Sequence, residues 1–513
     1  MINLLAKFKF SLRLAVFLIL FSLCLAVALG SAKDTHHPVS HLGLQSATQT
    51  NTPVFVHLFE WQWEDVAQEC EAFLAPSGYG AVQLSPAAEH VVVPEKGFPW
   101  WQRYQPVSYR IESRSGSRSE FAAMVQRCHA VGIKLYADAV INHMAALTQG
   151  VGNAGSSFTK YNYPGLYQPP DFHSCKKAIA DYQNRQEVTE CELVGLADLK
   201  TKSNKVQQQI ADYLIDLVHL GIDGFRIDAA KHISSKDVAA ILQKVNAAVD
   251  PDPYIYQEVI DPGNEVIRKS EYYTNGKVIE FEYGRSVGES FLGIDGQTLA
   301  QLETLGESWG LMPSEKAIVF IDNHDKQRGH GGGGHYLTYK NGRLYDLATL
   351  FMLAFPYGRP QVMSSYAFES ESQGPPADPK GQTNRIYSNG QALCGEDWIC
   401  EHRHPIVAAM VNFRNQIPPD APLTHWWSNG NQIAFGRGSS GFVVINRSDE
   451  PLSHTFQTDL TAGIYCNITA GRLAADGKSC TGEAIAVDRQ GHIHVQVDKL
   501  GAIAIHLSEK LQQ

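Results

Sequence analysis

Short apolar runs alternate with longer amphipathic stretches between residue 54 and about residue 366. The stretches repeat apolar positions at helical spacing, most clearly over residues 203–221. Alternation of this kind predicts a parallel sheet, and eight repeats favour a closed (β/α)8 TIM barrel over a doubly wound open sheet. The predicted strands are residues 54–59, 79–84, 133–142, 222–228, 254–259, 278–284, 317–325 and 360–366.

One connection in this series is much longer than the others. Residues 142–198 separate the third predicted strand from the fourth and are rich in Gly, Tyr, Pro and Asn. A connection of this length usually forms a functional segment or a domain of its own. We therefore expect a small inserted domain after the third strand, with the barrel divided into residues 53–141 and 199–420.

The pattern changes near residue 420. Apolar and polar positions alternate with a period of two over residues 492–507, and a hairpin is predicted around the Gly-Ser-Ser-Gly turn at 438–441. Residues 421–513 are therefore predicted to form an antiparallel all-β domain, a β-sandwich.

The amino terminus has a separate character. An apolar run at residues 15–29 follows three basic residues and ends in the small residues 30–32. This pattern predicts a secretory signal at residues 1–32, followed by a polar leader at 33–52. The run is short for a membrane anchor, so we expect a secreted protein with no membrane attachment after cleavage.

The net charge narrows the classes of molecule that the protein could bind. The formal net charge is -10, and loss of the basic signal makes the chain more acidic, which disfavours nucleic acid and anionic membranes. Neutral substrates remain open, and we expect a monomer.

Eight Cys remain after the signal, an even number that predicts disulfides. Local spacing favours the pairs Cys175–Cys191, Cys394–Cys400 and Cys466–Cys480, which leaves Cys70 with Cys128.

Acidic residues follow four of the predicted strands. Asp138, Asp228, Glu258 and Asp325 each come after an apolar run. Barrel enzymes place their chemistry at the carboxyl ends of the strands. Several acids on one rim repel one another, and only a function or a bound metal readily explains such an arrangement. Hydrolysis of glycosides needs such a set, with a carboxylate nucleophile and a protonated acid on either side of the bond.

Four short signatures carry a family resemblance. "DAVINH" (138–143), "GFRIDAAKH" (224–232), "QEVI" (257–260) and "FIDNHD" (320–325) occur in the order and spacing of the α-amylase family. Further segments at 59–63, 99–109, 327–335 and 400–405 extend the similarity from about residue 53 to the end. They resemble the chloride-dependent, animal-type branch of secreted α-amylases.

The resemblance implies a role for each of three carboxylates. Asp228 would be the nucleophile, Glu258 the acid/base, and Asp325 would stabilise the transition state through sugar hydroxyls. Arg226 lies two residues before Asp228 on the same strand face and should keep that aspartate ionised. Retention of configuration follows, with the two reacting carboxyls roughly 5 Å apart.

The resemblance also implies substrate contacts. Apolar sugar faces pack on indole rings, so Trp101 is the expected stacking platform. The loop "HDKQRGHGGGGH" could suggest zinc bound by His324, His330 and His335, but four consecutive Gly favour a mobile flap over a rigid metal site. The expected substrate-binding residues are Trp100, Trp101, Tyr104, Gln105, His143, Arg226, Lys231, His232, His324 and His330.

Two ions are implied in the same way. Asn142, Asp198 and the main-chain oxygens of Thr189 and His232 match calcium ligands, and such oxygen donors suit a hard cation. Arg226, Asn323 and Arg343 match residues that hold chloride, since two guanidinium groups and an amide form a donor-only site.

Together these features predict a retaining glycoside hydrolase that cuts internal α-1,4-glucosidic bonds of starch, glycogen and maltooligosaccharides. Two alternatives stay open. One is a maltogenic or transglycosylating enzyme of the same family, and the other is a non-catalytic carbohydrate-binding relative. The presence of all three carboxylates argues against the second.

Overall fold

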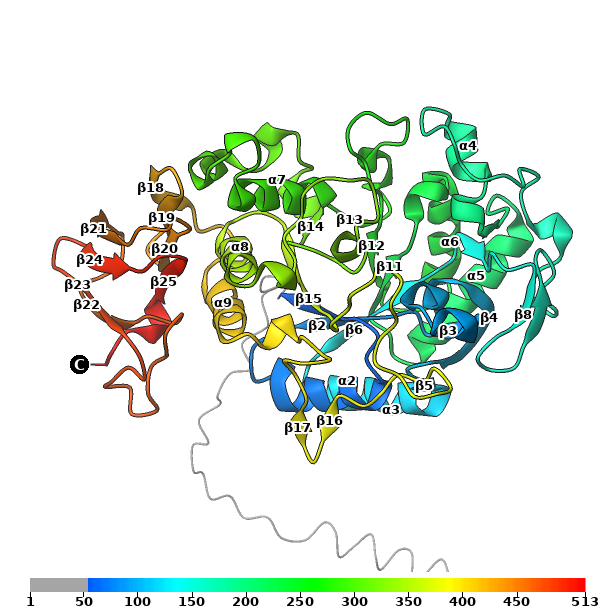
Figure 1. The fold of residues 1–513 in the computed structure, drawn as a ribbon, viewed down its shortest axis with the longest axis horizontal. Helices are drawn as coiled ribbons and strands as arrows, with labels where there is room; N and C mark the ends of the chain where they lie inside the picture. Colours follow the sequence, from blue (N-terminus) through cyan, green and yellow to red (C-terminus); the bar gives the residue numbers. More distant parts are fainter. Residues whose placement is uncertain (1–53, 513) are drawn as a thin grey trace, which may run out of the picture. The chain divides into compact units, whose positions relative to one another are not determined.

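Eight parallel strands close into a barrel in the computed structural model, which describes residues 54–512 (Figure 1). Neighbouring strands pair in order around the barrel, and the last pairs with the first through Phe55 and Gln361. The TIM barrel is therefore confirmed. The strands are β1 (Phe55–Leu58), β2 (Ala81–Leu84), β6 (Lys134–Ala139), β11 (Gly224–Ile227), β12 (Tyr254–Gln257), β13 (Lys277–Ile279), β14 (Ala317–Val319) and β15 (Arg359–Ser364). The predicted signal and leader lie outside the described residues.

All eight strands lie where the apolar runs predicted them, but most are shorter than predicted, and two end well before the predicted residue. Residues 278–284 were predicted as one strand, whereas β13 ends at Ile279 and helix α7 begins at Phe281. The Glu280 side chain accepts a hydrogen bond from the Glu282 N–H, which caps this helix and stops the strand. Similarly, β14 ends at Val319, and residues 320–325 form a buried loop.

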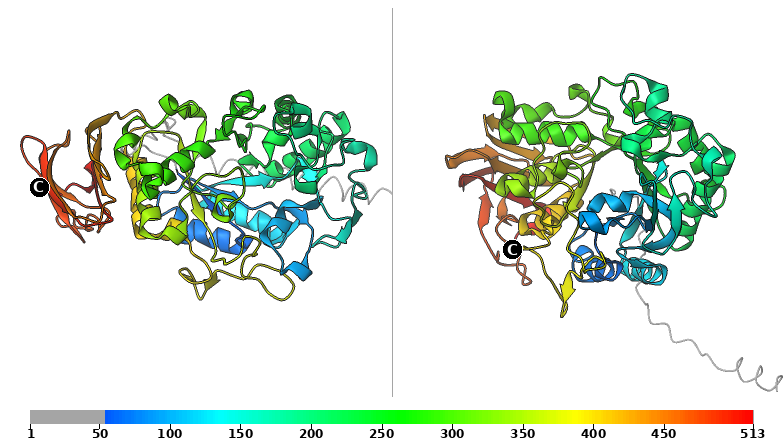
Figure 2. Two further views of the ribbon diagram at one scale, coloured as in Figure 1. Left: turned by 45° about the horizontal axis from the view of Figure 1, so that its top comes forward. Right: turned by 45° about the vertical axis from the view of Figure 1, so that its right-hand side comes forward.

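Helices surround the barrel strands (Figure 2). Side chains cap the N-termini of some of these helices: Ser117 and Glu120 form a capping box, and Ser234 accepts from the Asp237 N–H. Among residues 54–512, no helix combines the length and the apolar character needed to cross a membrane. The main helices are α2 (Trp63–Glu69), α3 (Arg118–Ala130), α5 (Asn204–His219), α6 (Ser235–Asn246), α7 (Phe281–Leu292), α8 (Arg343–Ala354) and α9 (Pro405–Gln416).

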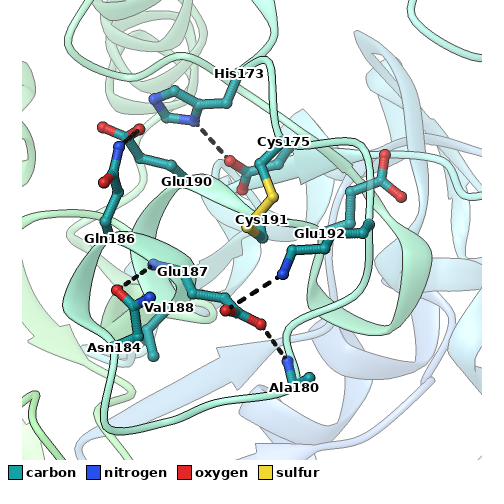
Figure 3. The surroundings of a disulfide bond; sticks show 12 residues. His173, Cys175, Ala180, Asn184, Gln186, Glu187, Val188, Glu190, Cys191 and Glu192 are labelled. Carbon is teal, nitrogen blue, oxygen red and sulfur yellow. Dashed lines mark hydrogen bonds and ion pairs between the residues drawn. A yellow bond between two sulfur atoms is a disulfide. The ribbon is translucent and has the colours of Figure 1, made fainter.

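The long connection after β6 forms a small excursion from the barrel. Its two ends pair as antiparallel strands, β7 (His143–Met144) with β10 (Ala197–Asp198), and it contains the hairpin β8 (Gln149–Val151) and β9 (Ser157–Thr159). Figure 3 shows its disulfide, Cys175–Cys191, beside helix α4 (Arg185–Glu190). Asn184 caps this helix, and the Glu187 carboxylate accepts from the Ala180 N–H at 2.7 Å.

The carboxy-terminal segment is entirely antiparallel. A four-stranded sheet faces two strand pairs, and apolar residues from both layers, such as Phe442 and Ile493, form one buried cluster. The predicted hairpin at 438–441 is confirmed. The four-stranded sheet contains β18 (Leu423–Asn429), β19 (Gln432–Arg437), β20 (Gly441–Asn446) and β25 (Gly501–His506). The pairs are β21 (Leu452–Gln457) with β24 (His492–Val497) and β22 (Gly463–Cys466) with β23 (Ala484–Val487).

Three arginines join the barrel to this domain. Arg437 donates to the Ala354 carbonyl at 2.6 Å, Arg447 to the Phe291 carbonyl at 2.6 Å, and Arg343 to the Leu500 carbonyl at 3.1 Å.

All four predicted disulfides are also confirmed: Cys70–Cys128, Cys175–Cys191, Cys394–Cys400 and Cys466–Cys480.

Candidate active site

Four carboxylates lie at the carboxyl ends of the barrel strands. Asp138 lies in β6, Asp228 follows β11, Glu258 follows β12, and Asp325 follows the loop after β14. Asp228, Glu258 and Asp325 line a cavity of about 650 Å³, whereas Asp138 is fully buried and is not part of the lining. The other predicted residues that line this cavity are Trp100, Trp101, Tyr104, Gln105, His143, Lys231, His232, His324 and His330.

Arg226 lies beneath these carboxylates and contacts three of them. Its Nη1 lies 2.7 Å from Asp138 and 2.8 Å from Asp228, and its Nη2 lies 2.7 Å from Glu258. Its side chain is only 2% exposed, so the guanidinium acts in a medium with little solvent screening. One buried cation therefore brings Asp228 and Glu258 to two neighbouring nitrogens. Strand β11 carries Arg226 between the apolar residues Phe225 and Ile227 and so places this guanidinium.

The chain turns sharply after Asp228. Ala229 has a φ of 48°, in the left-handed region that non-glycine residues rarely adopt. In this conformation its N–H donates to Glu258 Oε2 at 2.8 Å. The strained turn therefore orients a main-chain donor toward the Glu258 carboxyl.

Burial raises the pKa of three of these carboxyls. Burial raises the pKa of Glu258 to about 8; Arg226 opposes the rise, and Asp228 and Asp325 add to it. Burial likewise raises the pKa of Asp325. It also raises that of Asp138 to about 7, although Arg226 and the Tyr104 hydroxyl, 3.1 Å away, stabilise its charged form. Glu258 thus keeps its proton near neutral pH, as a general acid requires.

Neutral aromatic and imidazole groups form the wall beside these carboxylates. The His324 ring stacks on Tyr104 at 5.1 Å, and burial holds its pKa well below the ordinary value. His143 contacts the Tyr104 carbonyl at 3.0 Å, and burial lowers its pKa too. The Trp100 indole N–H donates to the Glu371 carbonyl at 2.8 Å, so this ring is fixed, while Trp101 remains partly exposed.

The excursion supplies cavity residues that sequence reasoning missed. Tyr182, Leu193, Val194 and Leu196 all line the cavity. Val194 is 79% exposed and has a φ of 44°, unusual for a β-branched residue. These positions follow no periodic pattern, and no signal in the sequence would have separated them from ordinary loop residues.

Two of the predicted calcium ligands, Asn142 and Asp198, lie where the excursion leaves and rejoins the barrel. Asn142 and Asp198 are 1% and 3% exposed, and the Leu199 N–H donates to the Asn142 carbonyl. Burial raises the pKa of Asp198 to about 7, and His173 is its hydrogen-bonding partner at 2.6 Å. Thr189 lies in the last turn of α4, where helix carbonyls lack partners within the helix. Buried oxygen donors of this kind fit a hard cation.

Arg343 lies away from the buried site of Arg226, so the prediction that it binds chloride there is wrong. Arg343 is the first residue of α8, its side chain is 41% exposed, and it contacts Leu500 and Asp346 on the outside of the barrel. Asn323 is buried, and its side-chain oxygen accepts from the Lys326 N–H. Arg226 already contacts three carboxylates, which repel an anion. Without Arg343 the predicted set lacks its second guanidinium and does not fit a chloride ion.

Comparisons with known proteins agree with this geometry. The model of the α-amylase catalytic domain matches residues 101–357, and that of the α-amylase C-terminal all-beta domain matches residues 426–508. Pancreatic alpha-amylase 2a5 of Mus musculus is 44% identical over 90% of this chain and 96% of its own length. The alpha-amylase of Tribolium castaneum is 46% identical over 89% of this chain and 94% of its own length. The crystal structure of alpha-amylase I from Eisenia fetida has a TM-score of 0.83 at 40% identity, covering 89% of this chain and 97% of that one. The chain therefore belongs to the α-amylase family.

Proposed function

We propose that this protein hydrolyses internal α-1,4-glucosidic bonds of starch, glycogen and maltooligosaccharides with retention of configuration. The observation that carries the proposal is the pair Asp228 and Glu258, held by one buried guanidinium at the floor of a cavity lined by aromatic rings. A solved structure of a mutant Eisenia fetida amylase that contains maltohexaose supports a glucan as the ligand.

In the first step, Asp228 attacks the anomeric carbon while Glu258 gives its proton to the departing glycosidic oxygen. The raised pKa of Glu258 keeps that proton available near neutral pH. In the second step, Glu258 removes a proton from water, which attacks the same carbon and releases Asp228. Asp325 would hold sugar hydroxyls as positive charge develops on the ring.

Calcium is part of the proposal. Asn142, Asp198 and the main-chain oxygens of Thr189 and His232 would hold the ion, which would supply a fixed charge that joins the excursion to the barrel. Helix α4, which carries Thr189, packs against the turn that carries His232. Chloride has no place in the mechanism, because the second arginine that it would need lies elsewhere.

We also propose that the protein is secreted, for which the amino-terminal pattern is the support, and that it acts as a monomer. A maltogenic or transglycosylating activity is the alternative within the family, and no contact in the cavity favours it. The non-catalytic alternative conflicts with the presence of all three carboxylates in the cavity.

The test is to incubate the purified, calcium-loaded protein with an end-blocked maltooligosaccharide and with starch. We expect internal cleavage and α-configured maltose and maltotriose. Products of β configuration would contradict the mechanism, and predominant transfer to sugar acceptors would support the alternative. No reaction with either substrate would favour a binding protein.

A further inference from the structure

The glycine-rich segment beside the active site has little means of holding its own shape. Residues 330–334, which we call the flap, contain four consecutive glycines with φ values of 75°, 94°, 74° and 87°. Glycine populates such conformations readily and loses much backbone entropy when it is fixed in one of them. The position of the flap must therefore be imposed by groups outside it.

The flap nevertheless lies in a defined place over the cavity. His330, Gly331 and Gly332 line the cavity, and the His330 N–H donates to the Asp325 carbonyl at 3.0 Å. The imidazole of His330 lies 6.0 Å from the Trp100 ring, measured between centroids. An expected sugar-binding histidine is thus already directed toward the site.

Lys326 supplies the polar anchor. Its ammonium donates to the Gly331 carbonyl and, at 3.1 Å, to the Gly333 carbonyl. The same nitrogen lies 4.5 Å from the centre of the Tyr336 ring, and the residue is only 7% exposed. Within residues 54–512 no ion pair joins this ammonium to a carboxylate. Its charge is thus directed at the flap carbonyls and at aromatic faces.

Apolar contacts complete the support but cannot replace the anchor. The Ile260 side chain lies beside Gly331 and Gly332, and the stem of Arg285 lies beside Gly334, so close that a Cβ added at any of the three would meet them. Such contacts limit how closely the flap approaches the barrel, but they are non-directional. Beside the hydrogen bond from the His330 N–H, the two charge-assisted hydrogen bonds from Lys326 are directional, and they hold the carbonyls of Gly331 and Gly333.

We propose that Lys326 is a positioning residue that fixes the flap over the active site and so sets His330 in place before substrate binds. This rests on the proposed function of the cavity as a sugar site. An ammonium that anchors the flap in advance lowers the ordering cost that substrate would otherwise meet on binding. Loss of the anchor should therefore weaken binding more than it slows bond cleavage.

The anchor should also depend on pH. Burial lowers the pKa of Lys326 to about 8, opposed by nearby acids, so about nine-tenths of it is charged at pH 7 and about one-tenth at pH 9. The neutral amine makes weaker hydrogen bonds to carbonyls, so the flap should loosen as pH rises through 8. The charged groups around this amine are Asp325, Glu258, Glu282 and Arg285, together with His330 on the flap.

The experiment compares the wild type with Lys326→Met, which keeps the length of the side chain and removes the charge. Lys340→Met is the matched control, because Lys340 also lies over an aromatic ring, that of Phe368 at 3.7 Å, but contacts no flap carbonyl in the described structure. Hydrogen exchange of residues 327–338 is measured without substrate at pH 6.5 and 9, corrected for intrinsic exchange. KM and kcat for maltoheptaose are measured at pH 6.5.

We expect the His330 amide, which donates to the Asp325 carbonyl, to be protected at pH 6.5 in the wild type and in Lys340→Met and to lose protection at pH 9. In Lys326→Met this amide should exchange fast at both values, and KM should rise about tenfold with a smaller change in kcat. Unchanged protection and KM in Lys326→Met would overturn the proposal, as would wild-type protection that does not change with pH. The exchange result needs no turnover, so a protein that fails to cleave glucans would refute the proposed function without refuting the anchor.

Discussion

Replacing Arg226 with Met should make the stability of the protein strongly dependent on alkaline pH. Arg226 contacts Asp138, Asp228 and Glu258, and it lowers the pKa of both Asp138 and Glu258 against the opposing effect of burial. Without the guanidinium, both pKa values rise above about 7 and about 8 respectively. The methionine fills a similar volume, so the lost charge dominates the change.

The size of the effect follows from proton linkage. Above each wild-type pKa, the native variant keeps a proton that the native wild type has released. A native state that binds more protons loses stability as pH rises, by about 1.4 kcal/mol per pH unit per proton. Between pH 7 and pH 9 this applies over about two units for Asp138 and about one unit for Glu258. The stability gap should therefore widen by roughly 4 kcal/mol.

The assay is calorimetric unfolding at pH 7, 8 and 9 in saturating calcium. For a chain of this length, the entropy of unfolding per residue converts about 1 kcal/mol to about 1 °C in Tm. We expect the Tm gap between the wild type and Arg226→Met to widen by about 4 °C over this range. Arg118→Met is the control, because Arg118 pairs with Asp216 where both side chains are exposed, and its gap should stay small and constant. An equal Tm gap at pH 7 and pH 9 for Arg226→Met would refute the reasoning.

Three further outcomes are expected. Asp228→Asn should abolish turnover but keep the Tm and oligosaccharide binding, because an amide cannot attack the anomeric carbon; clear residual hydrolysis would place the nucleophile elsewhere. Excess EDTA should remove about 3 kcal/mol of stability from the wild type, for a site held at a hundred times its Kd, and so lower its Tm, and should leave the Tm of Asp198→Asn unchanged; equal shifts in both would exclude this site. Replacing chloride with acetate should leave kcat and its pH profile unchanged, and Arg343→Gln should behave like the wild type in both salts; a chloride-dependent kcat would restore an anion site.

Most of the fold could be predicted from the sequence because parallel strands are buried on both faces. Such strands appear as short continuous apolar runs, and those at 54–59 and 254–259 correspond to β1 and β12. Strand ends were less certain. Apolar residues also begin α7, so the run at 278–284 could not show that the strand gives way to a helix after Ile279.

The carboxylates of the site could be predicted because each ends a barrel strand or follows one closely. The prediction for Arg343 was wrong for the opposite reason, because it depended on the similarity of a short sequence segment and not on a position relative to a strand. In the structure it begins an outer helix and faces the C-terminal domain. Contacts such as Val194 and the anchor formed by Lys326 depend on how loops return to the barrel, which residue patterns do not encode.

The arginines between the barrel and the C-terminal sheets affect how freely the sequences of these two domains can change independently of each other. Arg437, Arg447 and Arg343 each donate to a main-chain carbonyl across the boundary. A main-chain acceptor persists whatever side chain the position carries, so the accepting residues can be exchanged with little loss at the junction. At these three hydrogen bonds only the donors are constrained. A C-terminal module from another family member should therefore be graftable onto this barrel, provided that it brings its own two arginines, leaves a carbonyl within reach of Arg343 and keeps an aromatic residue where Phe435 packs on Phe351.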